Sequence, residues 1–392
     1  MNQSKQVQFL TAESVRAGHP DKFCDQIADR ILDMYLTRNP KACVAVEVMA
    51  TQGKVLVSGE ATKVSPRLIE KAVKGVIKRV GYGPEEFGLP EGVCMDCEFR
   101  IHEQSSDIAQ AVKGKEELGA GDQGIVIGYA TDETKQFLPL PVVLSHAICR
   151  RLDEIQENVP WMKPDGKVQV TVRYVGDEPT FVDTVVVSVQ HDESVPQEQI
   201  QEFVEKKVVR KVIPEYCLIS LTKILVNPSG RFVKGGPAAD TGLTGRKLAV
   251  DQYGPFARCG GGALSGKDPT KVDRSGAYAA RWIAKNIVAT GLAKRCEVQI
   301  AYAIGVAKPV RVSVDTFGTG RVNDRLVADA VEKVFDLRPA AMIDALELRR
   351  PIYQSLAVYG HFGRKELDLP WERLNRRKEL LDAVIAMNEA ES

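Results

Sequence analysis

A glycine-rich segment at residues 259–268 has the spacing of a phosphate-binding loop. From Gly261 to Lys267, glycines would let backbone N–H groups approach an anion, and the lysine would supply a positive charge. The match fails at its last position, because Asp268 stands where a Walker A motif places the Ser or Thr hydroxyl that binds magnesium. The segment alone is therefore a weak match to the P-loop of a kinase or NTPase, which is the main alternative function, and a glycine-rich turn without a ligand stays open. The residues that flank it favour a polyphosphate site.

More cations and aspartates flank this loop. Asp240 precedes the adjacent cations Arg246 and Lys247, and Lys271 and Asp273 follow the loop. Cations beside turns of permissive backbone suit a polyphosphate, whose charges are costly to desolvate unless they are neutralised. A solvated basic face is the simpler interpretation, but the interleaved aspartates fit the binding of a divalent metal or an ammonium group better.

A histidine directly precedes a predicted helix. In the segment 18–22, His19 stands before a proline at a favourable helix-starting position, and Asp21 follows in the first turn. The unpaired N–H groups and the dipole of a helix start favour anions, so His19 could donate to an oxygen and Asp21 could reach a magnesium ion that bridges phosphates. Proline and aspartate also begin helices without a chemical role, so both interpretations stand.

Three further carboxylates lie at turns or on strands. Asp122 is at the centre of the glycine-rich turn 119–124, which leads into a strand-like apolar run and so does not match the dinucleotide-binding fingerprint. Glu47 and Glu60 lie on a predicted hairpin. A carboxylate facing inward there would need a cation partner, and one facing outward would carry no functional information.

The elements that would position these residues occur three times in one order: helix, hairpin, helix, strand. The periodicity predicts these elements at 20–35, 43–50 with 54–59, 66–80 and 93–101; at 142–155, 168–174 with 181–189, 197–213 and 217–226; and at 275–290, 297–306 with 310–315, 324–335 and 352–358. We therefore predict an α+β fold of three similar domains, each a small mixed sheet with helices on one face. The predicted boundaries are 4–104, 118–234 and 235–378, with a mobile active-site loop at 104–119.

Composition narrows the class of partner. The 392 residues include 53 Lys+Arg and 52 Asp+Glu, and the net charge of +1 argues against binding to nucleic acid or to a membrane. The chain has no apolar run of membrane-spanning length and a polar start, so we expect a cytoplasmic protein with small-molecule partners. Its eight cysteines are widely spread, which predicts reduced thiols. Cys94 and Cys97 could be half a zinc site or a redox pair, although packing is the simpler interpretation.

Taken together and in this order, the motifs resemble the S-adenosylmethionine synthetase (methionine adenosyltransferase) family, from 9–15 to 359–364. The resemblance implies three α+β domains about a pseudo-threefold axis. It also implies attack of the methionine sulfur on C5′ of ATP, followed by hydrolysis of the released triphosphate to pyrophosphate and phosphate. Because a thioether has no proton to lose, such a reaction needs metal ions and cationic clamps on the triphosphate more than a general base.

The resemblance assigns a role to individual residues. The implied catalytic residues are His19, Lys167, Arg246 and Lys267. The implied ATP-binding residues are His19, Asp122, Asp165, Lys167, Arg231, Phe232, Arg246, Lys247, Ala263 and Lys267. The implied methionine contacts are Glu60, Gln104, Asp240 and Lys271. The implied metal ligands are Asp21 and Asp273 for Mg²⁺, two ions per site, and Glu47 for K⁺.

Some positions depart from the family pattern. Cys259 stands where the family usually has His, Leu264 where it has Phe, and 104–107 reads QSSD in place of QSPD in a loop that looks short. No departure removes a charged site residue, which argues against a non-catalytic nucleotide-binding relative. The resemblance further implies ATP and L-methionine as substrates, and a homodimer or dimer-of-dimers tetramer with its sites at the interface.

Overall fold

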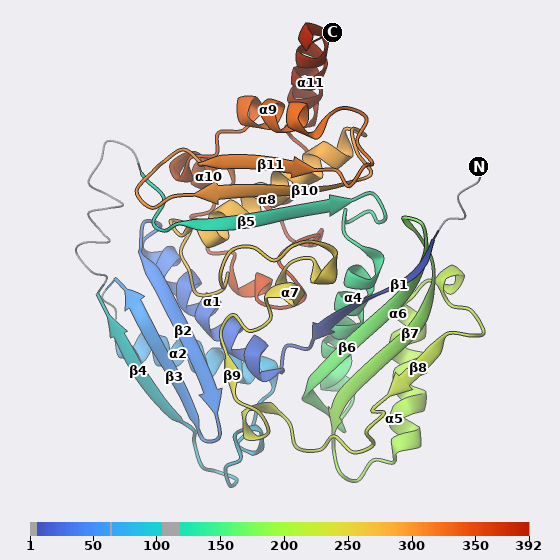
Figure 1. Ribbon diagram of the computed structural model, residues 1–392. Coiled ribbons are helices and arrows are strands. Elements are labelled where there is room, and N and C mark those ends of the chain that lie inside the picture. Colours follow the sequence, from blue (N-terminus) through green and yellow to red (C-terminus); the bar gives the residue numbers. More distant parts are fainter. Residues whose placement is uncertain (1–5, 63–64, 104–117, 392) are drawn as a thin grey trace.

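The computed structural model describes residues 6–62, 65–103 and 118–391. Three small sheets with packed helices lie around the middle of the molecule (Figure 1), so the predicted α+β architecture of three units is confirmed. The predicted mobile loop at 104–119 falls almost wholly outside the described residues.

The first sheet has the strand order β1-β6-β7-β8. Its strands are β1 (Val7–Val15), β6 (Met162–Val175), β7 (Glu178–His191) and β8 (Lys223–Val226). Its helices are α4 (Leu140–Ile155) and α5 (Gln197–Val204), the latter continued by a π-helix (Glu205–Val209) and α6 (Arg210–Val212). The predicted hairpin and helices are therefore confirmed, while the strand predicted at 217–226 is limited to its last four residues.

The second sheet has the order β4-β3-β2-β9 and the third β11-β10-β5. The second consists of β2 (Val44–Thr51), β3 (Lys54–Ala61), β4 (Asp96–His102) and β9 (Gly242–Leu243), with helices α1 (Pro20–Arg38) and α2 (Pro66–Val80). The third consists of β5 (Gly124–Thr131), β10 (Arg295–Tyr302) and β11 (Arg311–Asp315), with helices α8 (Val272–Ala289), α9 (Asp324–Val334), α10 (Pro339–Ala345) and α11 (Arg377–Glu391).

Each sheet recruits one strand from a distant part of the chain. The amino-terminal β1 pairs with β6, β5 pairs with β10, and β9 pairs with β2 at Met49 and Ala50. These long-range pairings tie the three sheets together. The pairing of β9 with β2 also places the segment that follows Gly242 beside the start of α1.

The segment 352–358 corrects the predicted repeat. It forms a 3-10 turn at Gln354–Leu356 in place of a strand. The N–H groups of Tyr353 and Gln354 donate to the carboxylate of Asp33 on α1, at 3.0 and 2.8 Å, so this backbone is satisfied by a side chain and not by a sheet partner. Within the described ranges, the third sheet is consequently all antiparallel, whereas each of the other two contains one parallel pair.

Helix α1 is almost completely enclosed. Fifteen of its nineteen residues are buried, including Phe23, Ile27 and Ile31 on the predicted apolar face. Its other face is also buried but charged, and burial of charge requires partners. The partners of this charged face are the loops described below.

Two further observations concern the state of the cysteines and the apolar character of the helices. All eight cysteines are free thiols, as expected for a reduced protein. In the described parts of the chain, no helix combines the length and the apolar character needed to cross a membrane.

A buried histidine of α4 that contacts β1 predicts that the fold is sensitive to acid. His146 Nδ1 lies 2.8 Å from Ser14 Oγ, and burial lowers the pKa of His146 to about 3. Unfolded histidine takes up a proton below about pH 6.5 while the folded ring stays neutral, so this group destabilises the fold by about 1.4 kcal/mol per pH unit below that value. The unfolding free energy of His146→Gln, measured with denaturant between pH 6 and 4.5, should fall less steeply with decreasing pH than that of wild type, by this contribution. A variant profile parallel to the wild-type profile would contradict this assignment.

Candidate active site

The start of α1 presents His19 and Asp21. Pro20 occupies the first helical position, and His19 caps the helix by accepting a hydrogen bond at Nδ1 from the Asp21 N–H at 3.2 Å. Burial lowers the pKa of His19 to about 3, with Lys247 and Lys167 adding to this effect and Asp21 opposing it. The ring is therefore neutral at pH 7, with its proton on Nε2. It can donate one hydrogen bond to an anion at the positive end of the helix dipole.

The loop 242–247 meets this helix start. Asp21 accepts hydrogen bonds from the Leu243 N–H at 3.0 Å and from Lys247 Nζ at 2.5 Å, and Arg246 Nη1 lies 3.6 Å away. Burial alone would raise the pKa of Asp21, but Lys247 and the Leu243 N–H hold it below its ordinary value. An ionised carboxylate and two cations thus lie directly beside His19.

The glycine-rich loop 260–267 lies between β5 and the start of α8 and contacts both. Gly261 N–H donates to the backbone of β5, and Asp273 in the first turn of α8 accepts from Gly262 N–H at 3.0 Å and from Lys267 Nζ at 2.7 Å. A Cβ at position 262 would lie only 3.1 Å from Lys267 Nζ. The absence of a side chain at position 262 therefore leaves space for the Lys267 ammonium group beside the Asp273 carboxylate.

Asp268 does not occupy the position of a P-loop hydroxyl. Its carboxylate is fully buried and accepts from Val44 N–H at 2.7 Å, Thr270 N–H at 2.9 Å and Lys271 Nζ at 2.6 Å. Helix α8 begins only at Val272, so the loop does not lead straight into a helix N-terminus as a P-loop does. The kinase or NTPase geometry considered from the sequence is therefore not formed.

Strand β6 brings Lys167 and Asp165 to the same region. Lys167 lies close enough to His19 to lower its pKa. The Asp165 carboxylate accepts from Gly166 N–H at 2.7 Å and from Gly236 N–H at 2.9 Å, and burial raises its pKa to about 6. Asp165 thus fixes the turn at Gly236, in addition to any contact with a nucleotide.

The residues predicted for methionine differ in exposure and in partners. Glu60 Oε1 lies 3.3 Å from His102 Nε2 in a solvent-exposed contact, and Asp240 is also exposed. Lys271 is held by Asp268, as described above. The fourth predicted contact, Gln104, falls outside the described residues.

The remaining predicted residues differ in exposure and in contacts. Arg231 is exposed and paired with a neighbouring glutamate, whereas the Phe232 N–H donates to a buried histidine ring. The Cα and Cβ of Ala263 pack against the 242–247 loop. Asp122 is exposed, and its carboxylate accepts from the next backbone N–H, while Glu47 is exposed on β2.

Comparison with known proteins decides the family. The S-adenosylmethionine synthetase family models match as an N-terminal domain at 7–106, a central domain at 117–232 and a C-terminal domain at 234–373. The chain belongs to the S-adenosylmethionine synthetase family. It is 50% identical over 389 residues to the S-adenosylmethionine synthase of Clostridium tetani (strain Massachusetts / E88), covering 96% of this chain and 99% of that protein. It is 52% identical over 385 residues to that of Desulforudis audaxviator (strain MP104C), covering 95% and 97%.

These comparisons confirm the family resemblance and the enzyme class, a methionine adenosyltransferase, that it implied. The roles of individual residues stay predictions.

The donor groups of the site bear on how this family member could bind a metal ion. Among the described residues, no three His, Cys, Asp or Glu side chains gather into a cage for a metal ion. Mg²⁺ needs no such cage, because it commonly uses one or two carboxylates, water and substrate phosphates. Asp21 and Asp273, each beside a lysine that could turn to a phosphate, fit that mode of binding.

Sequence reasoning missed the charged network behind the site. Five charged side chains are almost completely buried and bind one another or the loop backbones: Lys22, Asp25, Asp29, Asp251 and Arg274. Burial raises the pKa of Asp251 to about 7, although Lys22 opposes this effect. The signal in the sequence was the recurrence of aspartate every four residues from position 21 to position 33, which places all four on one side of α1.

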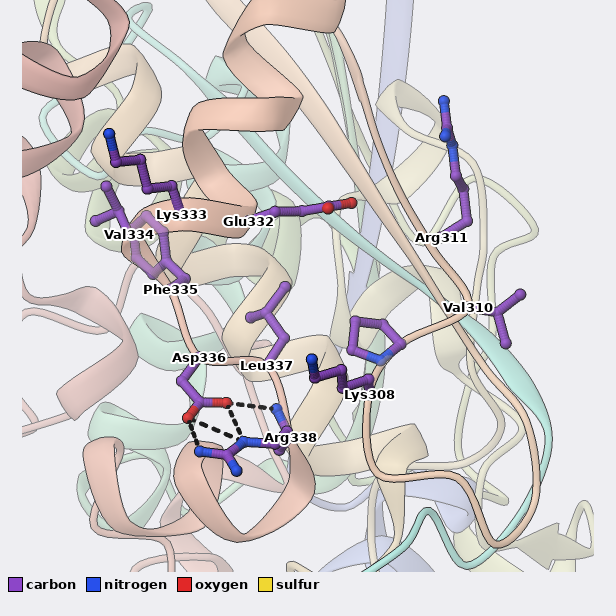
Figure 2. Close-up of a pocket in the computed structure, with 11 residues that line it drawn as sticks. Lys308, Val310, Arg311, Glu332, Lys333, Val334, Phe335, Asp336, Leu337 and Arg338 are labelled. Atoms are coloured by element: carbon purple, nitrogen blue, oxygen red, sulfur yellow. Dashed lines mark hydrogen bonds and ion pairs between the residues drawn. The ribbon is translucent and has the colours of Figure 1, made fainter. Parts of the chain in front are cut away.

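A separate pocket of about 710 Å³ lies between the start of β11 and the segment joining α9 to α10 (Figure 2). It is lined by exposed cations such as Lys308 and Arg311, and Arg338 pairs with Asp336 on its wall. The residues predicted for ATP, methionine and metals do not line it.

Proposed function

We propose that this enzyme makes S-adenosylmethionine from ATP and L-methionine by attack of the methionine sulfur on C5′ of ATP. The observation that carries the proposal is that two glycine-containing loops, each with a lysine that pairs with an aspartate, are both attached to the first three turns of α1. Such an arrangement suits a polyanionic leaving group. The names of the two relatives support the same product.

The chemistry requires little proton transfer. A bond forms between sulfur and C5′, the bond from C5′ to the triphosphate oxygen breaks, and the thioether becomes a sulfonium without losing a proton. Charge develops on the departing triphosphate, where His19 Nε2–H, Lys167, Arg246 and Lys267 would stabilise it. The neutral state of His19 at pH 7 fits a hydrogen-bond donor that does not change protonation.

The ion pairs of the free enzyme suggest how it receives metal and nucleotide together. Lys247 neutralises Asp21, and Lys267 neutralises Asp273. When phosphates bind, each lysine would turn to a phosphate oxygen and each carboxylate would become available to Mg²⁺. Bound Mg²⁺ would neutralise triphosphate charge and orient the phosphates. The same clamps would hold the product triphosphate while it is hydrolysed to pyrophosphate and phosphate.

The finer assignments follow the family pattern. Glu60, Asp240 and Lys271, with Gln104, would bind the ammonium and carboxylate groups of methionine, and Glu47 would bind K⁺. We further propose a cytoplasmic homodimer or dimer of dimers with its sites at the interface. The exposed apolar residues Val7 and Phe9 on β1, and Ile125 on β5, support an assembly that covers the sheets.

The direct test of the product is a methionine-labelling experiment. The purified enzyme, incubated with sulfur-labelled methionine, ATP, Mg²⁺ and K⁺, should convert the label into a permanent cation that is retained on cation exchanger at high pH. Conversion should require both ATP and Mg²⁺. Label that remains in methionine, while ATP is consumed to ADP, would overturn the proposal in favour of a kinase or NTPase.

A further inference from the structure

Four aspartates recur along one side of α1 with a spacing of four residues. Asp21, Asp25, Asp29 and Asp33 are all buried, and each accepts at least one hydrogen bond from a backbone N–H outside the helix. Successive members are about 6 Å apart along the helix axis. The helix therefore presents a row of carboxylates at fixed intervals, and each of them holds a segment of the chain outside the helix.

Asp25 holds the loop that carries Arg246 and Lys247. Its Oδ1 accepts from Gly245 N–H at 2.9 Å, and its Oδ2 accepts from Lys22 Nζ at 2.9 Å. Lys22 also pairs with Asp251, at the end of the short helix that follows the loop. The loop is thus attached to α1 on both sides of its two cations.

Asp29 holds the loop that carries Lys267. Its Oδ1 accepts from Gly266 N–H at 2.9 Å, and Arg274 bridges both carboxylate oxygens at 2.7 and 2.9 Å. Arg274 Nη1 also donates to the carbonyl of Lys267 at 3.3 Å. Gly266 has a φ of +78°, and a Cβ there would lie 2.1 Å from the Val46 carbonyl, so the loop enters this contact in a conformation reserved for glycine.

We infer that Asp25 and Asp29 are positioning residues, which set the spacing and direction of the two triphosphate-binding loops from a single rigid helix. Neither carboxylate takes part in the proposed metal or phosphate contacts. Each acts through a loop amide adjacent to, or two residues before, a phosphate-binding lysine. The inference rests on the proposed function insofar as the ligand is a triphosphate.

The row contains its own matched control. Asp33 is also buried, and its two oxygens accept from Tyr353 N–H and Gln354 N–H, which belong to neither loop. In all three aspartates both oxygens face donors, so an Asn substitution can satisfy only one side. Asp25→Asn, Asp29→Asn and Asp33→Asn thus impose the same chemical change at three heights of one helix.

The experiment measures two quantities on each full-length variant in the absence of substrates. Hydrogen exchange should accelerate in 242–247 for Asp25→Asn, in 262–268 for Asp29→Asn, and in neither loop for Asp33→Asn. Affinity for inorganic tripolyphosphate with Mg²⁺, measured by calorimetry, should fall at least about tenfold in the first two variants, the effect of one hydrogen bond to a charged group. It should stay within about twofold of wild type in Asp33→Asn.

Any one of three results would overturn the inference. They are wild-type loop exchange in both loop variants, wild-type tripolyphosphate affinity in both loop variants, and an equal loss of affinity in Asp33→Asn. Should Asp29→Asn fail to fold because Arg274 loses its partner, Asp25→Asn decides alone, since Lys22 retains Asp251 there. If wild type binds tripolyphosphate but makes no sulfonium product, the proposed function fails while these measurements still decide the role of the two aspartates.

Discussion

Lys267→Ala should lower kcat/KM for S-adenosylmethionine formation by about 10²- to 10³-fold, the loss typical of removing one preorganised charge donor from a transition state. The Lys267 ammonium lies 2.7 Å from Asp273 on a loop fixed by Gly262 and Gly266, so it is poised for a triphosphate oxygen. Removing it leaves Asp273 with its bond from Gly262 N–H. Unfolding free energy should therefore change by no more than about 1 kcal/mol.

Lys308→Ala is the matched control for Lys267→Ala. Lys308 is an exposed lysine of the separate pocket in Figure 2, away from the predicted site residues. This variant should retain wild-type turnover within about twofold, as expected for a surface substitution. Steady-state assays with saturating methionine and varied MgATP measure both variants. Wild-type turnover in Lys267→Ala would refute the assignment of this residue as a phosphate clamp.

Asp21→Asn should raise the Mg²⁺ concentration for half-maximal activity by about tenfold or more, because a neutral amide replaces a charged ligand. The Asn oxygen can still accept from Leu243 N–H, so the loop contact at 3.0 Å can persist while the charge disappears. Activity should recover in part at high Mg²⁺. The measurement is a Mg²⁺ titration at fixed ATP.

Asp33→Asn, at the other end of the same helix, controls for a general effect on α1 and should titrate like wild type. An Asp21→Asn curve that coincides with the wild-type curve would show that Asp21 is not a metal ligand.

The sequence predicted elements best where local pattern and packing agree. The helix from Pro20 carries a proline start and an apolar repeat, and the hairpins alternate β-branched residues between turns, so these elements form as expected. The segment 352–358 looks like a strand locally. It is a turn because Asp33, more than three hundred residues earlier in the chain, takes its N–H groups. Such a long-range competitor has no signature in local propensity.

The sequence predicts the chemistry of the candidate site better than it predicts the residues that hold the loops of the site in place. Glycines beside Lys247 and Lys267 indicated an anion site, because permissive backbone next to cations is typical of anion-binding loops. The roles of Asp25 and Asp29 could not be read in the same way, since an aspartate in a helix usually lies on a solvated face. Only the fold shows that this face of α1 is covered by the two loops. The domain boundaries at 4–104, 118–234 and 235–378 stay predictions.

Product analysis tests the central claim most directly. The enzyme is incubated with ATP, Mg²⁺ and K⁺, with and without methionine, and nucleosides and phosphates are separated. We expect S-adenosylmethionine, pyrophosphate and phosphate in equal amounts, no ADP, and little turnover without methionine. ADP formed without a sulfonium product would contradict the account, because the site would then be transferring or hydrolysing the γ-phosphate and not displacing the whole triphosphate from C5′.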